Sequence, residues 1–429
     1  MQDARVLTAK APNRVEALDL APEALAERQL VSDRERTRRF PALFTRKLLR
    51  MSGSPLAYLR GAAPLYYDLL RTRPELAAGP DGEGWITGDM HLENVGAYRA
   101  TPLGADEPKD APDRKVRFDL NDFDDAVIGP WRLDVLRLAT SLLLGGRELG
   151  ATGLVALELC DRLLEAWARS AFDGAPLPAQ PPAVVALCEQ VHARSKSALL
   201  ASRTVVLDGK RRFVRGARYA DLAPEVVAAV PAAFEGYLAS LRPEDRPHKG
   251  SFEILDCALR IAGTGSLGGL RVAVLVVGKG GEDGGWIFDM KEQGEPSAAS
   301  LLGAPVGDPA ERVATAFRAT VERPMRMIGT TRLAFGDVPL FVRKLSPQED
   351  KLNLRRLRAA ELPELATYLG ALVGAGHARA ATRTSARWTT SDLAALRANA
   401  IALAGIHEAV YLALCDRMRP LLPTADAGA

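Results

Sequence analysis

The sequence predicts an α+β protein of two lobes, with a mainly helical lobe first and a smaller antiparallel β lobe later. The chain has 429 residues, about three times the ~150 residues of a typical domain. Its apolar fraction of 47% and charged fraction of 25% are those of globular proteins and exclude a wholly disordered or fibrous chain. Helical patterns dominate the first half, and short β-prone runs between glycines follow. The two kinds of element are therefore segregated along the chain.

Charge and cysteine content exclude several classes of protein. A net charge of +3 is small for this length and does not indicate a nucleic-acid or membrane-surface partner. Uninterrupted apolar runs such as Val272 to Val277 are far below the ~20 residues of a spanning helix. The four cysteines form no C-x-x-C pair, which argues against a disulfide framework or a zinc ribbon. We therefore expect a cytoplasmic protein with reduced thiols, and the sequence does not indicate its oligomeric state.

The first part of the chain predicts helices around two polar loops. Residues 1–40 are rich in Glu, Arg and Ala and predict a helical arm that needs packing partners to be ordered. Residues 41–245 predict a helical large lobe, in which Ser54 and Pro55 suit a helix start. Within it, two short strands flank a polar hairpin from Thr101 to Arg114. Gly129-Pro130 opens a further helix.

The second part predicts the β lobe and then more helices. The polar segment from Arg242 to Gly250 suits a linker. Residues 251–345 predict three strands, a helix from Asp308 to Val321, and two more strands. Residues 346–429 predict helices that complete the large lobe. Ser391 or Asp392 is the expected cap of the last one.

A group of acidic residues is the first candidate site. Asp89, His91 and Asn94 lie in GDMHLEN, and Asp122 and Asp124 lie in DLNDFDD. Phosphoryl transfer needs a carboxylate near the attacking hydroxyl and oxygen ligands for Mg²⁺. The alternative is that Asp and Asn occupy turns because their side chains bond their own backbone. So many carboxylates on one strand pair repel each other unless a cation offsets them, which favours a metal or phosphate site.

A glycine-rich segment is the second candidate site. Gly263, Gly265, Ser266 and Gly268 lie in GTGSLG between two predicted strands, and Lys291 ends the strand after these. This order is typical of a loop that folds over nucleotide phosphates, which the lysine then reaches. The predicted helix that follows presents Glu311 as a partner for that lysine. The alternatives are an ordinary hairpin turn and a solvated edge-strand lysine.

A basic stretch precedes the acidic group. Arg46, Lys47 and Arg50 lie on one predicted helix. Arginines there could clamp a substrate phosphate or carboxylate. A solvated basic helix face explains the same pattern equally well.

Four blocks of the sequence resemble a bacterial family known only as domain of unknown function 2252 (DUF2252). The blocks are residues 46–62, 88–96, 118–139 and 262–292, and the resemblance spans roughly residues 40–380. The GDMHLEN block and the segment from Asp122 to Ala139 are in turn similar to the aminoglycoside phosphotransferase branch of the protein-kinase-like fold. That branch has a GD-x-H-x-x-N catalytic loop and a D-F-x-D magnesium segment.

The resemblance implies roles for individual residues. It implies Asp89 as the catalytic aspartate, with His91 organising its loop and Asp134 bracing it. Asp134 alternatively suits the first turn of a helix through the helix dipole. By the same comparison, Asn94 and Asp122 would hold magnesium, Asp124 and Asp125 would add to the metal shell, and Lys291 with Glu311 would hold the phosphates of ATP.

The order of the blocks departs from that fold, in which the small β lobe precedes the catalytic loop. Here the segment from Gly263 to Lys291 follows Asp89 by some 170 residues. A circular permutation would reconcile the two orders, with the helix through Tyr368 to Arg379 preceding the catalytic loop in space. The expected fold is therefore a permuted protein-kinase-like fold of two lobes.

The expected function is an ATP- and Mg²⁺-dependent phosphotransferase with an unidentified hydroxyl-bearing acceptor. One alternative is a kinase-like module that binds a nucleotide or a partner without catalysis. Nucleotidyl transfer on the same fold is another. A metal-dependent phosphoesterase is less favoured, because the pair Asp89 and His91 lacks the later histidine ligands of such sites.

Overall fold

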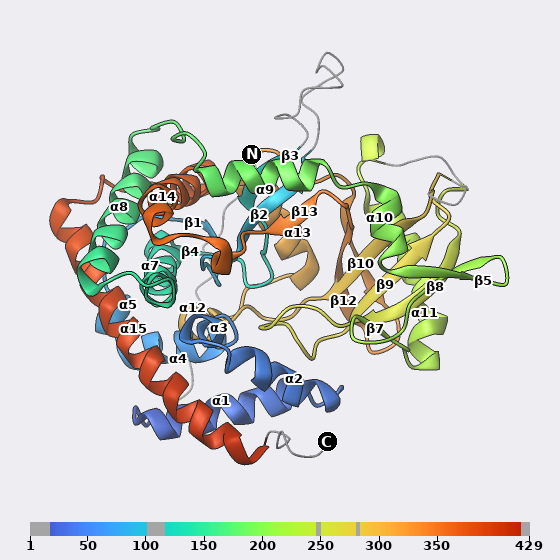
Figure 1. Cartoon of the computed structure of the whole chain (residues 1–429), viewed down its shortest axis with the longest axis horizontal. Helices are drawn as coiled ribbons and strands as arrows, with labels where there is room; N and C mark the ends of the chain where they lie inside the picture. Colours follow the sequence, from blue (N-terminus) through green and yellow to red (C-terminus); the bar gives the residue numbers. More distant parts are fainter. Residues whose placement is uncertain (1–17, 101–115, 246–249, 280–283, 422–429) are drawn as a thin grey trace.

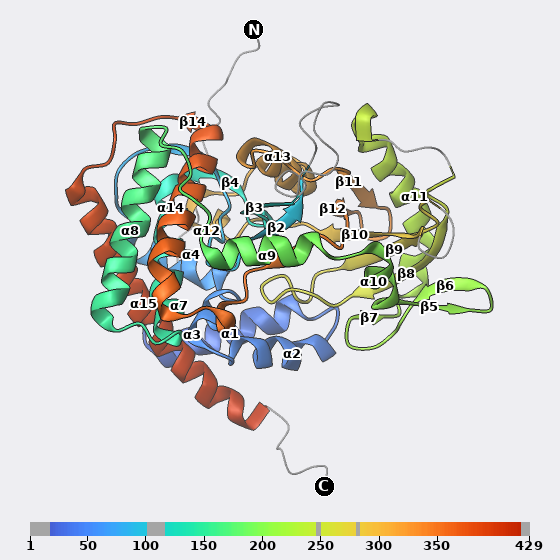
Figure 2. The same cartoon turned by 45° about the horizontal axis from the view of Figure 1, so that its top comes forward.

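The computed structural model describes residues 18–100, 116–245, 250–279 and 284–421 (Figure 1). Helices gather on one side of the molecule and a six-stranded antiparallel sheet lies on the other (Figures 1 and 2). The predicted α+β class is therefore confirmed. The hairpin predicted from Thr101 to Arg114 lies outside the described residues.

The large sheet has the strand order β11-β12-β10-β9-β8-β7. Its side chains alternate between two faces. Val272, Phe288 and Val342 point to the face that helix α11 (Pro224–Ser240) covers, where they form an apolar core. The other face is turned toward the loops of the helical part and carries charged side chains. The strands are β7 (Tyr219–Ala220), β8 (Ile254–Arg260), β9 (Arg271–Val276), β10 (Trp286–Glu292), β11 (Ile328–Leu333) and β12 (Val338–Lys344).

The helical part is built around α8 (Gly153–Phe172) and α14 (Leu362–Arg379), which pack closely because glycines face the contact. A Cβ at Gly370 would lie 2.1 Å from the carbonyl oxygen of Leu163. Alanine or anything larger there would push the two helices apart. Helix α7 (Trp131–Glu148) lies against them in the same core.

Helix α15 (Thr390–Met418) is long and apolar enough to cross a membrane by length and composition, the one such helix in the part of the chain described here. One face of it contributes Leu396 and Leu403 to the helical core and Leu414 to a second core. Of its most apolar stretch, 39% is buried against the rest of the chain. Its cap is Thr389, whose hydroxyl accepts from the backbone of Asp392, rather than the predicted Ser391 or Asp392.

Two small three-stranded sheets carry the polar loops. One has the order β14-β1-β4 and the other β13-β2-β3. Residues 87–94 connect β1 to β2, and residues 121–126 connect β3 to β4. Strand β13, which follows the last strand of the large sheet in sequence, pairs with β2. It therefore lies next to the loop of residues 87–94, which leads into β2. The strands are β1 (Glu83–Ile86), β2 (Val95–Arg99), β3 (Val116–Leu120), β4 (Val127–Pro130), β13 (Glu349–Lys351) and β14 (Ala381–Arg383).

The N-terminal helices α1 (Pro22–Arg36) and α2 (Ala42–Met51) pack against the rest of the chain, as the arm was expected to need. Leu25 and Met51 share a core with residues of α15. The predicted cap is confirmed, since the Ser54 hydroxyl accepts from the backbone at 3.1 Å. The remaining α-helices and strands are α3 (Pro55–Leu59), α4 (Ala63–Thr72), α5 (Pro74–Ala77), α9 (Pro182–His192), α10 (Lys196–Ala201), β5 (Thr204–Leu207), β6 (Lys210–Phe213), α12 (Ala299–Leu302) and α13 (Pro309–Thr320).

Candidate functional site

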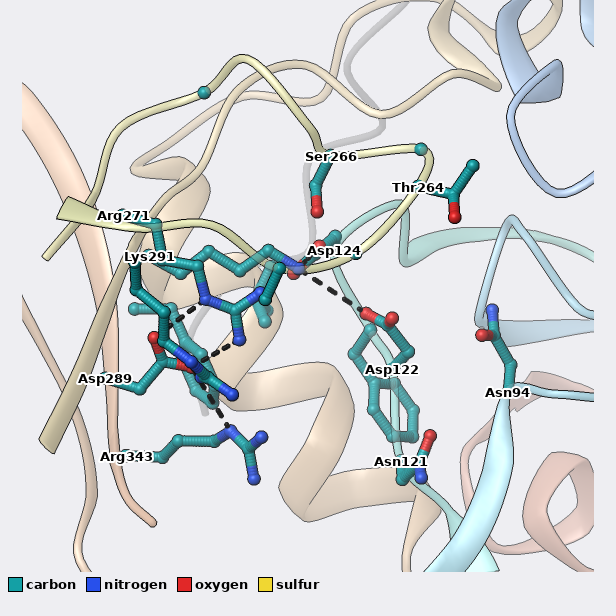
Figure 3. A pocket seen from close by; sticks show the side chains of 18 of the residues that line it. Asn94, Asn121, Asp122, Asp124, Thr264, Ser266, Arg271, Asp289, Lys291 and Arg343 are labelled. Carbon is teal, nitrogen blue, oxygen red and sulfur yellow. Dashed lines mark hydrogen bonds and ion pairs between the residues drawn. The ribbon is translucent and has the colours of Figure 1, made fainter. Parts of the chain in front are cut away.

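A cavity of about 940 Å³ lies between the charged face of the large sheet and the two polar loops. This volume is at the upper end for small-molecule sites. Figure 3 shows the arrangement, with residues of the large sheet at one end and Asn94, Asn121 and Asp122 at the other. Eleven of the thirteen residues predicted to have catalytic, metal-binding or phosphate-binding roles line the cavity, and the two that do not are Asp134 and Glu311.

The loop after β1 begins with a turn that only glycine fits. Gly88 has φ +74°, and a Cβ there would lie 2.0 Å from the carbonyl oxygen of Asp125. Asp134, in the first turn of α7 and fully buried, accepts the backbone N–H groups of Thr87 at 2.7 Å and Gly88 at 2.9 Å. His377 Nε2 lies 3.3 Å from the same carboxylate. Asp134 therefore fixes the start of this loop from outside the cavity.

Asp89 points from this loop into the cavity and is paired with a buried cation. Arg137 of α7 is fully buried, and its Nε donates to Asp89 Oδ1 at 2.7 Å. The guanidinium of Arg137 also lies over the ring of Tyr66, 4.5 Å from the ring centroid. Burial raises the pKa of Asp89 to about 7, although the Arg137 guanidinium opposes the shift. Asp89 can thus gain or lose a proton near neutral pH.

His91 and Asn94 shape the same loop. The Glu93 backbone N–H donates to His91 Nδ1 at 3.1 Å. Burial first, and neighbouring cations second, hold the pKa of His91 well below its usual value. His91 is therefore neutral and carries its proton on Nε2, which lies 3.8 Å from Asp89 Oδ2. The Asn94 amide nitrogen donates to the Asp89 carbonyl oxygen at 2.6 Å, so its amide oxygen stays available as a ligand.

The carboxylates of the second loop meet lysines from distant segments. Lys291 of β10 donates to Asp124 and lies 3.9 Å from Asp122 (Figure 3). The Nζ atom of Lys351, on β13, lies 4.0 Å from Oδ2 of Asp122, whereas Lys291 approaches Oδ1. Burial disfavours the charged form of Asp122, but the two ammonium groups outweigh it and keep the pKa of Asp122 below its usual value. The repulsion among these carboxylates was expected to need a cation, and Lys291 and Lys351 supply the positive charge.

The oxygen atoms of Asp122 and Asn94 suit a single Mg²⁺ ion whose other ligands are phosphates and water. Within the described ranges, no three His, Cys, Asp or Glu side chains form a group that could hold a metal by themselves. Asp122 and the amide oxygen of Asn94 offer two oxygen ligands, which is what Mg²⁺ takes when phosphates and water complete its shell. Both oxygens of Asp124 are already used, by Lys291 and by Gln293. Asn94 and Asp122 therefore fit such an ion better than Asp124 does.

The glycine-rich loop closes the cavity on the side of the N-terminal helices. Gly263 and Gly268 have positive φ, at +83° and +110°, which suits glycine alone. The Gly265 carbonyl oxygen accepts from Arg36 at 3.0 Å and from Lys47 at 3.3 Å. The basic stretch of helix α2 thus binds loop carbonyls through Lys47, and through Arg50 on the Gly263 carbonyl.

The predicted pairing of Glu311 with Lys291 is wrong. Glu311 is in the first turn of α13 and accepts from the Thr330 hydroxyl of β11, outside the cavity. The turn of α13 that faces the polar loop instead presents Arg312, which donates to the Asp124 carbonyl oxygen at 2.9 Å. Lys291 pairs instead with Asp124 of the acidic loop.

Sequence reasoning missed the charged side chains that line the sheet end of the cavity. Asp289 of β10 is buried and bonded by Arg260 of β8 and Arg271 of β9. Arg343 of β12 lies beside them and donates to Glu349 at 2.7 Å. Arg271 and Asp289 lie inside the block 262–292 but outside its glycine-rich motif and were given no role. The one signal in the sequence was a charged residue at an inward position of the strands β8, β9, β10 and β12.

Comparison with known proteins gives one match. Residues 39–416, most of the chain, match the model of a family described as "Uncharacterized protein conserved in bacteria (DUF2252)". No curated protein and no solved structure matches significantly.

Proposed function

Given that the chain belongs to this uncharacterised bacterial family, we propose from the geometry of its cavity that it is an ATP- and Mg²⁺-dependent phosphotransferase. Its acceptor would be a hydroxyl-bearing molecule. The single observation that carries the proposal is the meeting of Lys291 with Asp122 and Asp124. These groups lie some 170 residues apart in sequence and face one cavity with Asp89. A purely structural role gives no reason to gather them around open space.

A permuted protein-kinase-like fold accounts for the element order. In this proposal β8 to β12 with α13 form the small lobe, and α14 leads to the loop that carries Asp89. Two observations support it. The glycine-rich loop connects neighbouring strands β8 and β9, with Lys291 on the next strand of the sheet. The short strand β14, which follows α14 directly, pairs with β1, so the end of that helix lies near the start of the Asp89 loop.

The residues of the chain supply positioning and proton transfer. The acceptor hydroxyl oxygen attacks the γ-phosphorus of ATP, and the bond from this phosphorus to the β–γ bridging oxygen breaks. ADP leaves with the electron pair of that bond, while Asp89 takes the hydroxyl proton. Arg137 holds the Asp89 carboxylate in place, and Lys291 would bind phosphate oxygens. Asn94 and Asp122 would hold Mg²⁺, which supplies charge neutralisation on the phosphates when bound.

The phosphoesterase alternative is less well supported by the same geometry. A metal-ligating histidine needs a free ring nitrogen. In this chain His91 Nδ1 accepts from the Glu93 backbone, and Nε2 carries the proton.

Turnover of the γ-phosphate tests the proposal. We expect Mg²⁺-dependent release or transfer of the ATP γ-phosphate by the wild type. Asp89→Asn should lower kcat by about 100-fold or more, because the loss of a general base costs that much, and should leave the KM for ATP within a few-fold. Asp161→Asn is the matched control, since Asp161 forms an exposed ion pair with Arg397 on the helical part. Binding of Mg-ATP without turnover in the wild type would instead favour the non-catalytic module.

A further inference from the structure

Four arginines form one wall of the cavity at its sheet end, and we call Arg203, Arg260, Arg271 and Arg343 the arginine wall. Three of them come from strands β8, β9 and β12. Their register places them on one face, because Asp289 is the direct partner of Arg343, and Lys291 that of Arg271. Figure 3 shows Arg271, Asp289 and Arg343 gathered at the opposite end from Asn94.

The arginine wall holds more positive than negative charge. In the described part of the chain, the carboxylates that contact these guanidinium groups are those of Asp289 and Glu349. Arg271 Nε donates to Asp289 Oδ1 at 2.7 Å, and Arg343 Nη1 donates to Glu349 at 2.7 Å. Four buried or half-buried cations thus share two anions. Such an excess is costly in a water-poor site unless a ligand supplies negative charge.

Two donors of the wall have nothing to bind. The Nε atoms of Arg203 and Arg260 are buried and without a hydrogen-bond partner among the described residues. Arg203 Nη1 donates to the Tyr219 hydroxyl at 3.2 Å, and Tyr219 is the strand partner of Arg260. The two unsatisfied donors therefore belong to neighbouring side chains of one wall. A buried N–H group of an arginine without an acceptor is rare, because its desolvation is not repaid.

A planar, neutral nucleobase does not suit this end of the cavity. Base pockets are lined mainly by apolar side chains with few polar groups. The arginine wall instead presents fixed cations whose planar forks match the oxygens of a phosphate group.

We propose that the arginine wall is a second phosphate subsite beside the group around Asp122 and Lys291, which it meets where Arg271 pairs with Lys291. The molecules bound in the cavity would then place one phosphate group at the sheet end of the cavity and another beside the polar loops. This inference deepens the proposed function. It rests on that function for one point, that Lys291 binds a phosphate of the same ligand. The second phosphate could be the far end of a polyphosphate donor or the phosphate of a phosphorylated acceptor.

Calorimetric titration with inorganic tripolyphosphate in EDTA tests the subsite without magnesium or a base. We expect the wild type to bind, and Arg203→Gln and Arg260→Gln each to weaken the affinity by about 10-fold, the cost of one charge-assisted hydrogen bond. Arg212→Gln is the control, because Arg212 is exposed on β6 outside the cavity. The affinity of this variant for tripolyphosphate should stay within twofold of the wild-type value. Thermal unfolding of each variant shows whether it has folded. Arg203→Gln breaks no ion pair of Asp289, so it keeps the test valid if Arg260→Gln does not fold.

The outcomes separate this inference from the proposed function. No tripolyphosphate binding by the wild type, or equal affinities in folded Arg203→Gln and the control, would overturn the second subsite. Mg-ATP binding and turnover that survive in that case leave the proposed function standing. Asp122→Asn should lose Mg-ATP binding but keep tripolyphosphate binding in EDTA. Adenosine alone is expected not to bind.

The source of the phosphate follows from competition. Glycerol 2-phosphate is titrated into protein saturated with tripolyphosphate. Binding of both would assign the wall to a phosphorylated acceptor, and displacement would assign it to the end of the donor. Either result requires the subsite to exist.

Discussion

Asp89 is subject to two opposing influences, and their balance makes it suitable as a base. Burial raises the pKa of its carboxyl to about 7, while Arg137 stabilises the charged form. A carboxylate with an ordinary pKa would be a weaker base, and a fully neutral one would accept no proton. The neutral His91 beside it adds no competing charge.

The pKa of Asp89 predicts a pH dependence. Asp89 accepts a proton only when ionised, so the kcat/KM for γ-phosphate transfer should rise with pH through about 7 and level off above pH 8. Steady-state rates between pH 5.5 and 9 measure this. An activity that stays flat through pH 7, with the protein folded throughout, would rule out Asp89 as the base.

Single residues of the site were predictable where spacing carried the signal. Asp89, Asn94 and Asp122 were identified because aspartate and asparagine five positions apart, near a second acidic turn, have a chemical reason to be there. Arg137 was not predicted, since an arginine in an apolar helix stripe looks the same whether it faces solvent or a buried carboxylate. The error over Glu311 arose because helix spacing does not fix which turn of α13 faces Lys291.

At the scale of elements, helix α7 fixes the start of the loop between β1 and β2. Asp134 binds two consecutive backbone N–H groups there, and the backbone of Gly88 approaches that of Asp125. A rigid element thus holds the loop that positions Asp89. Preorganisation of this kind is what transfer between oxygen atoms requires.

Substitution of Gly88 tests this close approach. Gly88→Ala should reduce the free energy of unfolding by about 1–3 kcal/mol more than Gly150→Ala, because its Cβ meets backbone atoms. Gly150 is the matched control, since it also has positive φ, at +85°, but a Cβ there meets nothing within 4 Å. Urea unfolding of both variants gives the difference. Equal losses would mean that the loop can move away from the contact.

Five strands of the large sheet, β8 to β12, were predicted from the sequence. Its sixth strand β7, and β5 and β6, lie in the segment 41–245 that was predicted to be helical, and β13 and β14 were missed as well. Runs such as Leu270 to Val277 combine β-branched residues with flanking glycines, which marks a strand from local sequence. The strands β13 and β14 have three residues each and exist only because distant partners, β2 and β1, offer an edge. Their formation depends on tertiary contacts that no local pattern encodes.

At the scale of the whole molecule, the N-terminal helices connect its two sides. Lys47 of α2 forms a buried ion pair with Asp33 of α1 at 2.8 Å, and its ammonium group also donates to the Gly265 carbonyl. Arg39 pairs with Glu292 of β10 at 2.7 Å. These helices therefore hold the glycine-rich loop against the helical part and close the cavity on that side.

Removal of Lys47 should affect stability and the glycine-rich loop together. Lys47→Met leaves the buried carboxylate of Asp33 without a cation, which should cost about 3–5 kcal/mol of unfolding free energy. The double variant Asp33→Asn with Lys47→Met should recover much of that loss. Urea unfolding measures the stability of both variants. Amide hydrogen exchange of residues 263–269 should be faster in each variant than in the wild type. Loop exchange at the wild-type rate in a folded double variant would contradict the connection.

One measurement tests the central claim, that segments some 170 residues apart form a single nucleotide site. Mg-ATP is titrated calorimetrically into the wild type, Asp122→Ala and Lys291→Ala, with ATP in EDTA as the reference. We predict magnesium-dependent binding by the wild type and an affinity at least 10-fold weaker in each variant. Lys291→Ala removes a cation that contacts the phosphates, and Asp122→Ala removes a ligand of the Mg²⁺ that those phosphates share. Absence of Mg-ATP binding in the folded wild type, or binding that either variant retains unchanged, would contradict the account.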